Sequence, residues 1–141
     1  MATSRETELL IQLTNLQAAF QKTLTASLSA HGISVTEYLV LRQLEEAPGK
    51  KLRRIDLAQA VGLTPSGVTR LLNPMEKIGL VNKEAGARDA RVSLVAIAPA
   101  GETIYRESSV TFAETSKELL ASLNTRDRDA LSRIANALLK G

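Results

Sequence analysis

Apolar side chains recur at helical spacing over the start of the chain. Residues 5–30 contain neither proline nor glycine. Their apolar positions fall three or four residues apart, at Leu9, Leu13, Leu16, Phe20, Leu24 and Leu28. This spacing predicts one long amphipathic helix. The pair His31-Gly32 ends it, because glycine readily adopts the left-handed conformation that closes a helix.

A second, shorter helix follows this pair. Ser34 or Thr36 can cap its start with a side-chain oxygen, and the turn Ala47-Pro48-Gly49 closes it. The pattern predicts four buried positions along it: Tyr38, Leu39, Leu41 and Leu44.

Residues 56–81 predict a helix-turn-helix. The first helix is expected to turn four apolar side chains inward: Ile55, Leu57, Ala58 and Val61. Gly62 gives the backbone the freedom that a tight turn requires, and Leu63 fills the corner. Thr64 is a good N-cap and Pro65 suits a first helical position, so the second helix starts at Pro65.

The second helix combines a buried stripe with a polar face. The stripe consists of Val68, Leu71, Leu72 and Met75. Pro74 removes a backbone hydrogen bond, which predicts a kink or an early break near Asn73. Gly79 is the expected end of the helix.

A β-hairpin is predicted after Gly79. Residues 80–83 and 92–97 are rich in β-branched or apolar side chains, and Ala85-Gly86-Ala87 lies between them. The tip carries Arg88, Asp89 and Arg91, and basic side chains there can enter a minor groove. A hairpin tip that is merely solvated is the alternative.

The last third of the chain predicts two more helices, over residues 100–123 and 125–139, divided at Asn124-Thr125. A short heptad-like seam is formed by Leu131, Ile134 and Leu138. Together with the first helix, these helices carry apolar stripes that the small central unit cannot cover. We therefore expect them to pack against the same elements of a second chain; a bundle within one chain is the alternative.

These elements predict a single domain, residues 1–141, that is mainly α with a small β-hairpin. Its centre is a winged helix-turn-helix lobe over residues 33–98. Dimerisation helices over residues 5–31 and 99–140 flank this lobe.

Composition narrows the classes of function. Cysteine is absent, which excludes disulfides, thiolate metal sites and thiol redox switches. His31 is the single histidine, so we expect no metal, no cofactor and no enzyme. No apolar run approaches the roughly 18 residues that cross a bilayer, and the start does not look like a signal peptide. We expect a cytoplasmic protein without a membrane partner.

Positive charge gathers on the central segment. The net charge is +3; residues 42–91 hold ten Lys and Arg against six Asp and Glu, whereas residues 92–141 hold six of each. A basic excess at a helix-turn-helix suits phosphate binding and predicts double-stranded DNA as the partner. The predicted contacts are Thr64, Ser66, Gly67, Thr69, Arg70 and Asn73 in the major groove, with Arg88, Asp89 and Arg91 from the hairpin. A solvated helix face is the alternative.

Several motifs add to this prediction. The hairpin contains Asp89-Ala90-Arg91, then five residues, then Ile97-Ala98. Further motifs are Gly32-Ile33-Ser34, Leu57-Ala58, Val68-Thr69-Arg70 and the run from Leu72 through Met75-Glu76-Lys77 to Gly79-Leu80-Val81. With these residues the chain resembles the MarR family of winged-helix transcription regulators, whose hairpin signature is Asp-x-Arg, five residues, Leu-Thr. The resemblance covers nearly the whole chain.

The resemblance implies a homodimer that binds a palindromic operator, often as a repressor. It also implies release by a small phenolic or anionic effector between the lobes, which would change the spacing of the two reading helices. His31, Tyr38 and Arg42 are candidates for that pocket, with structural roles as the alternative. By position, Asp89 would orient Arg91 in the minor groove.

Two departures from the family pattern bear on this reading. Ala98 replaces a Thr that commonly caps the next helix. Ala90 replaces a frequent basic residue. A winged-helix protein-interaction module without DNA affinity is the alternative function, although the presence of Arg70 and Arg91 argues against it.

Overall fold

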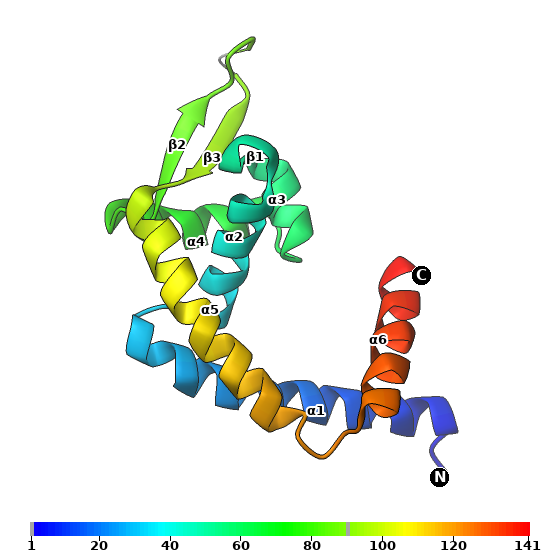
Figure 1. Ribbon diagram of the computed structural model, residues 1–141. Coiled ribbons are helices and arrows are strands. Elements are labelled where there is room, and N and C mark those ends of the chain that lie inside the picture. Colours follow the sequence, from blue (N-terminus) through cyan, green and yellow to red (C-terminus); the bar gives the residue numbers. More distant parts are fainter. Residues whose placement is uncertain (1, 90) are drawn as a thin grey trace.

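The computed structural model describes residues 2–89 and 91–141, so the departure at Ala90 lies outside the described residues. A lobe that contains the helix-turn-helix and a small sheet lies at one end of the molecule (Figure 1). Long helices extend from it to the other end. This is the mainly helical arrangement that the hydrophobic pattern predicts, with one more strand than expected.

The long N-terminal helix is confirmed as α1 (Arg5–Leu28). A short 3₁₀ turn (Ser29–His31) follows, and Gly32 with φ 74° closes the segment. The left-handed conformation explains why glycine stands there.

The second helix, α2 (Val35–Glu46), begins with a capping box. Ser34 Oγ accepts a hydrogen bond from the Glu37 N–H at 3.1 Å, and Glu37 Oε1 accepts one from the Ser34 N–H at 2.8 Å. Ser34 is thus the cap. Leu39 was expected inside but is 37% exposed, because it lies off the face that packs against α1 and α5. The other three predicted positions are buried: Tyr38, Leu41 and Leu44.

The helix-turn-helix consists of α3 (Arg54–Ala60) and α4 (Pro65–Lys77). Leu57 and Ala58 of α3 are buried as expected. The prediction for Ile55 is wrong: it is 56% exposed, because it lies in the first turn of α3 on the side away from Leu57.

α4 continues through Pro74 to Lys77, so the early break near Asn73 is wrong. Proline costs this helix one backbone hydrogen bond close to its end, and buried side chains on either side hold the helix in place. Gly79, with φ 82°, follows the helix as predicted. The buried side chains of α4 are Val68, Leu72 and Met75.

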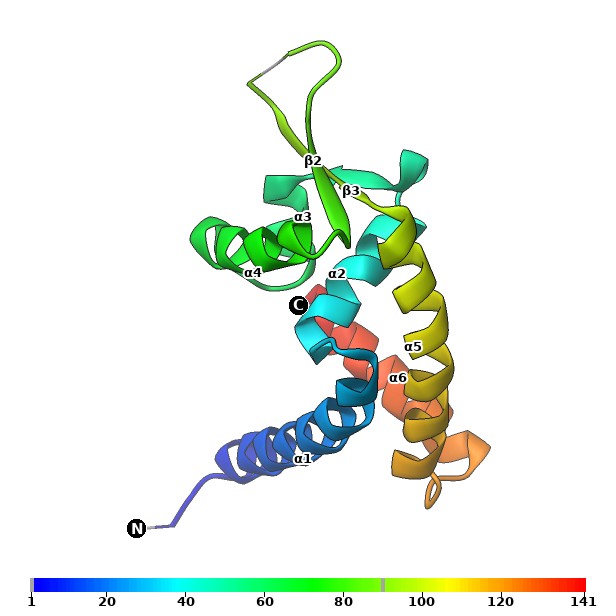
Figure 2. The same ribbon diagram turned by 90° about the vertical axis from the view of Figure 1, so that its left-hand side faces the viewer.

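The hairpin is confirmed as β2 (Val81–Ala85) and β3 (Ser93–Ile97), which pair in antiparallel register from Val81↔Ile97 to Ala85↔Ser93. A third strand, β1 (Lys51–Arg53), pairs with β3 and gives the sheet order β1-β3-β2. Sequence reasoning missed β1, because three residues are too few to show alternation. The hairpin projects beyond the lobe as a wing (Figure 2).

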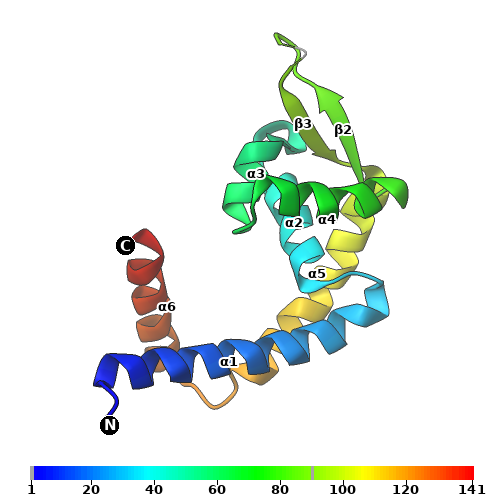
Figure 3. The same cartoon turned by 180° about the vertical axis from the view of Figure 1, so that it is seen from behind.

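Two C-terminal helices, α5 (Pro99–Leu119) and α6 (Thr125–Lys140), complete the chain. α5 starts after Ala98 without a side-chain cap, in line with the missing threonine, and it ends earlier than predicted. α6 stands away from the winged lobe (Figure 3). The structure describes every residue of α6, and none is buried.

In the described part of the chain, the helices fall short of the length and apolarity that spanning a membrane requires.

Two of the contacts between the lobe and α5 lie at the first turn of this helix. Gly101 lies so close to the Leu80 carbonyl oxygen that a Cβ there would collide with it, and the same oxygen accepts a hydrogen bond from the Ala98 N–H at 3.0 Å. Lys50 Nζ lies 3.0 Å from Glu102 Oε2 and 3.2 Å from Glu45 Oε1, and these bonds raise the pKa of Lys50. The lobe therefore packs tightly against the first turn of α5 and is ion-paired with it.

Gly101→Ala tests the tighter contact. Alanine normally stabilises a helix relative to glycine by about 1 kcal/mol. Here we expect the free energy of unfolding to fall by about 1–3 kcal/mol, because the methyl group overpacks the joint. Denaturant-induced unfolding measures this free energy. The exposed neighbour provides the control, since Ala100→Gly should cost at most about 1 kcal/mol. A gain in stability for Gly101→Ala would show that the joint is loose.

Candidate nucleic-acid interface

The exposed face of α4 begins at a side-chain cap. Thr64 Oγ1 accepts a hydrogen bond from the Gly67 N–H at 3.0 Å, and Ser66 Oγ lies 3.3 Å from the same oxygen. A Cβ at Gly67 would come within 3.1 Å of Thr64 Oγ1. A residue without a side chain therefore preserves this cap, and the two hydroxyl groups stay at the surface at the start of α4.

Farther along α4, neighbouring elements hold two of the predicted contact residues. Thr69 Oγ1 accepts a hydrogen bond from Arg54 Nη1 at 2.8 Å and donates one to the Pro65 carbonyl oxygen at 3.1 Å. Asn73 Oδ1 accepts a hydrogen bond from Lys83 Nζ, on β2, at 2.6 Å. Lys83 thus ties the wing to α4 and leaves the Asn73 NH₂ group as a donor toward solvent.

The wing tip carries the predicted pair. Arg91 Nε and Nη2 donate to Asp89 Oδ1 and Oδ2 at 3.2 and 3.3 Å, and the Arg91 N–H donates to Oδ1 at 2.9 Å. These bonds hold the pKa of Asp89 below its usual value, the Arg91 side chain contributing most. The Arg91 side chain remains 91% exposed, so the carboxylate fixes its direction without covering it. Arg88 is also exposed.

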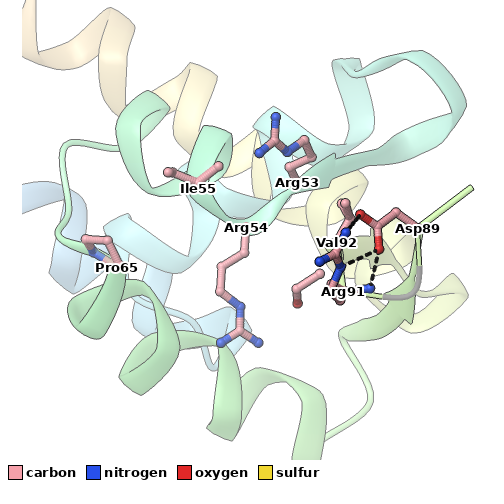
Figure 4. Close-up of a pocket in the computed structure, with 8 residues that line it drawn as sticks. Arg53, Arg54, Ile55, Pro65, Asp89, Arg91 and Val92 are labelled. Atoms are coloured by element: carbon pink, nitrogen blue, oxygen red, sulfur yellow. Dashed lines mark hydrogen bonds and ion pairs between the residues drawn. The ribbon is translucent and has the colours of Figure 1, made fainter.

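A hollow of about 540 Å³ lies between the starts of α3 and α4 on one side and the wing on the other (Figure 4). Three arginines and one carboxylate line it: Arg53, Arg54 and Arg91, with Asp89. Ile55, Pro65, Val92 and Ser93 complete the wall. Its charge is therefore positive, which suits a phosphate group.

Sequence reasoning placed four residues of this region elsewhere or did not single them out. Arg53 and Arg54 entered only the charge count, Ile55 was assigned to the core, and Lys83 was read as a strand residue. Two consecutive arginines directly before the helix-turn-helix were the available signal.

Comparison with known proteins agrees with this geometry. Residues 33–93 match the model of the MarR family. Over this segment the chain is similar to the MarR family. It is 24% identical to the transcriptional repressor MprA of Escherichia coli K12 over 89% of this chain and 71% of that protein.

Solved structures of MarR-type regulators share the fold. Sco3205, a MarR family transcriptional regulator from Streptomyces coelicolor solved in complex with DNA, superposes with a TM-score of 0.91. Its identity is 20%, over 100% of this chain and 89% of that one. The organohalide-sensing regulator RdhR-CbdbA1625, in its 2,4-dichlorophenol-bound form, gives 0.88 at 18% identity, over 97% of this chain and 80% of that one.

The three candidate effector residues lie along the contact between the 3₁₀ turn, α2 and α5. His31 Nε2 lies 2.7 Å from Thr111 Oγ1, and the Tyr38 hydroxyl lies 3.0 Å from Ser109 Oγ. Arg42 Nε donates to Glu46 Oε1 at 3.2 Å, which raises the pKa of Arg42.

A second hollow, of about 340 Å³, lies beside this contact, but these three residues do not line it. Burial raises the pKa of Tyr105 in its wall. The lining residues are Glu45, Glu102, Tyr105, Arg106 and Ser109. Within residues 2–89 and 91–141, no group of three or more His, Cys, Asp or Glu could hold a metal ion.

Arg91→Gln tests the wing pair without any DNA. Because Arg91 is the main cause of the lowered pKa of Asp89, its loss should move this pKa up toward the ordinary value. Carboxyl ¹³C NMR during an acid titration measures the midpoint. In the unaltered protein the pair is intact at neutral pH and opens as the pH falls through the lowered pKa. Arg88→Gln is the control and should leave the Asp89 midpoint unchanged. Equal midpoints in all three proteins would contradict the pairing.

Proposed function

We propose that the chain is a sequence-specific transcription regulator, most simply a repressor, that binds a palindromic operator in double-stranded DNA as a homodimer. One observation carries this proposal: the start of α4, at Pro65, and the Asp89-oriented Arg91 line the same arginine-lined hollow. The fold shared with the DNA-bound regulator Sco3205 supports it.

The arrangement of these features suits B-DNA. A helix fills a major groove, and an arginine on a wing tip enters the adjacent minor groove. One sugar-phosphate strand separates the two grooves. The positively charged hollow between the start of α4 and the wing would bind this strand. Ser66, Thr69, Arg70 and Asn73 then face base edges, while Arg53 faces a phosphate.

Exposed apolar side chains at the other end of the molecule support a homodimer. They lie on α1 and α6, and water would be removed from them if a second copy packed there. A two-fold axis would bring the same stripes together and set the two α4 helices about 34 Å apart, one turn of DNA. The exposed residues are Leu9, Leu10, Ile11, Leu13 and Leu16 on α1, with Leu131, Ile134, Leu138 and Leu139 on α6.

An effector of phenolic or anionic character completes the proposal. The neighbour RdhR-CbdbA1625 was solved with 2,4-dichlorophenol, and the region around Tyr38, Arg42 and Tyr105 combines aromatic rings with a guanidinium group. Binding there would change the separation of the two α4 helices and so the affinity for a rigid palindrome. We propose that the protein is not an enzyme and acts in the cytoplasm, where its DNA partner lies.

Salt dependence tests the DNA function. We expect binding to a random duplex to weaken steeply with salt, because each phosphate contact releases counterions. Arg91→Ala should cost about 1–3 kcal/mol on a selected operator. Fluorescence anisotropy with labelled duplexes measures both. Lack of binding at every salt concentration would favour the protein-interaction module instead.

Asp89→Asn separates orientation from charge at the wing. Removal of a negative charge alone would strengthen DNA binding, whereas loss of the group that directs Arg91 should weaken binding to the operator. We expect Asp89→Asn to bind the operator more weakly than the unaltered protein.

Leu138→Glu tests the dimer. A carboxylate in the shared apolar face should convert the protein to a monomer at micromolar concentration, because a buried unpaired charge costs several kcal/mol. Sedimentation velocity measures the mass. Ile78→Glu is the matched control, since Ile78 is similarly exposed but lies at the end of α4. If both variants remain dimeric, α6 is not the interface.

A further inference from the structure

Arg54 connects the start of α3 to the exposed face of α4. It is the first residue of α3, it is half-buried, and its guanidinium group lies at the wall of the hollow (Figure 4). Nη1 donates to Thr69 Oγ1 at 2.8 Å. Nε is buried and has no hydrogen-bond partner among the described residues. The side chain thus gives up solvation to make one hydrogen bond, with a residue on the exposed side of α4.

This contact limits what Thr69 can do. A threonine hydroxyl has one hydrogen to donate and two lone pairs that accept. The hydrogen goes to the Pro65 carbonyl oxygen at 3.1 Å, and one lone pair receives the Arg54 N–H. One lone pair and the γ-methyl group remain. Thr69 therefore meets a base edge as an acceptor or an apolar contact, and not as a donor.

We infer that Arg54 is a positioning residue that determines which base Thr69 reads. This inference rests on the proposed function. An acceptor suits the amino groups of adenine and cytosine, and a methyl group suits the thymine C5-methyl. The major-groove edge of guanine offers only the acceptors N7 and O6. Thr69 held in this way discriminates against guanine at the base it faces.

The neighbouring arginine gives a matched control. Arg53 precedes Arg54, lines the same hollow and carries the same charge, but it is exposed, and among the described residues it makes no hydrogen bond to α4. Loss of a pure phosphate contact weakens binding to all sequences equally and lowers the slope of affinity against salt concentration by about 1. A positioning residue changes the preference at one base pair.

The experiment begins with an operator selected by the unaltered protein from random duplexes. Each position of one half-site is then changed in turn, and affinities are measured for the unaltered protein, Thr69→Ala, Arg54→Met, Arg53→Met and the double variant Arg54→Met/Thr69→Ala. Thr69→Ala identifies the base pair that Thr69 reads. Thermal unfolding checks that each variant is folded.

We expect guanine to be disfavoured at the base that Thr69 reads. Arg54→Met should reduce the preference there by about fivefold or more, the scale of one lost base discrimination. The double variant should show no further loss at that position than Thr69→Ala alone, because both changes remove the same contact. Arg53→Met should weaken all sequences alike.

Each contrary result has a distinct meaning. If Arg54→Met acts like Arg53→Met, Arg54 is a phosphate contact, and the inference falls while the proposed function stands. The inference also falls if Thr69→Ala alters no position or if the unaltered protein prefers guanine there. This last measurement needs Thr69→Ala to locate the base pair but does not need Arg54→Met, so it decides the matter even if Arg54→Met does not fold. If the unaltered protein selects no duplex, the proposed function fails, and the inference fails with it.

Discussion

The burial of one apolar stripe of α4 against the sheet is the constraint on which the surface depends. Val68, Leu72 and Met75 share a core with Val81 of β2 and Val95 of β3. The wing and α4 therefore belong to one packed unit, and their spacing follows from side-chain volumes instead of from a flexible linker. A polar face and a basic tip serve a double helix only when their separation is fixed in this way.

Elements with strong local signals were predictable from the sequence. The apolar side chains three or four residues apart predicted α1. Gly62, Thr64 and Pro65 predicted the turn and the start of α4. β1 escaped because its three residues become a strand only through pairing with β3, more than forty residues farther along the chain. Pro74 wrongly predicted an early end of α4, because one missing backbone hydrogen bond costs less than the burial of the neighbouring side chains of α4 provides.

The site shows the same division between local and distant information. The Asp89–Arg91 pair was predictable because its partners are only two positions apart in the sequence, at the tip of the wing. The contacts from Arg54 to Thr69 and from Lys83 to Asn73 join separate elements, and no period or motif marks them. Composition indicated that the central segment is basic; only the fold reveals which cations meet the polar face of α4 and which remain free.

The joint at Gly101 gives α5 the character of a lever. Since the first turn of the helix is pressed against the Leu80 carbonyl oxygen, the lobe and the helix must swing together. The 21 residues of α5 extend for about 31 Å at 1.5 Å per residue. A tilt of about 6° at the far end would then carry the lobe roughly 3.4 Å, the rise of one base pair. A small rearrangement beside α1 would thereby be enlarged into a misfit of a whole step along the duplex.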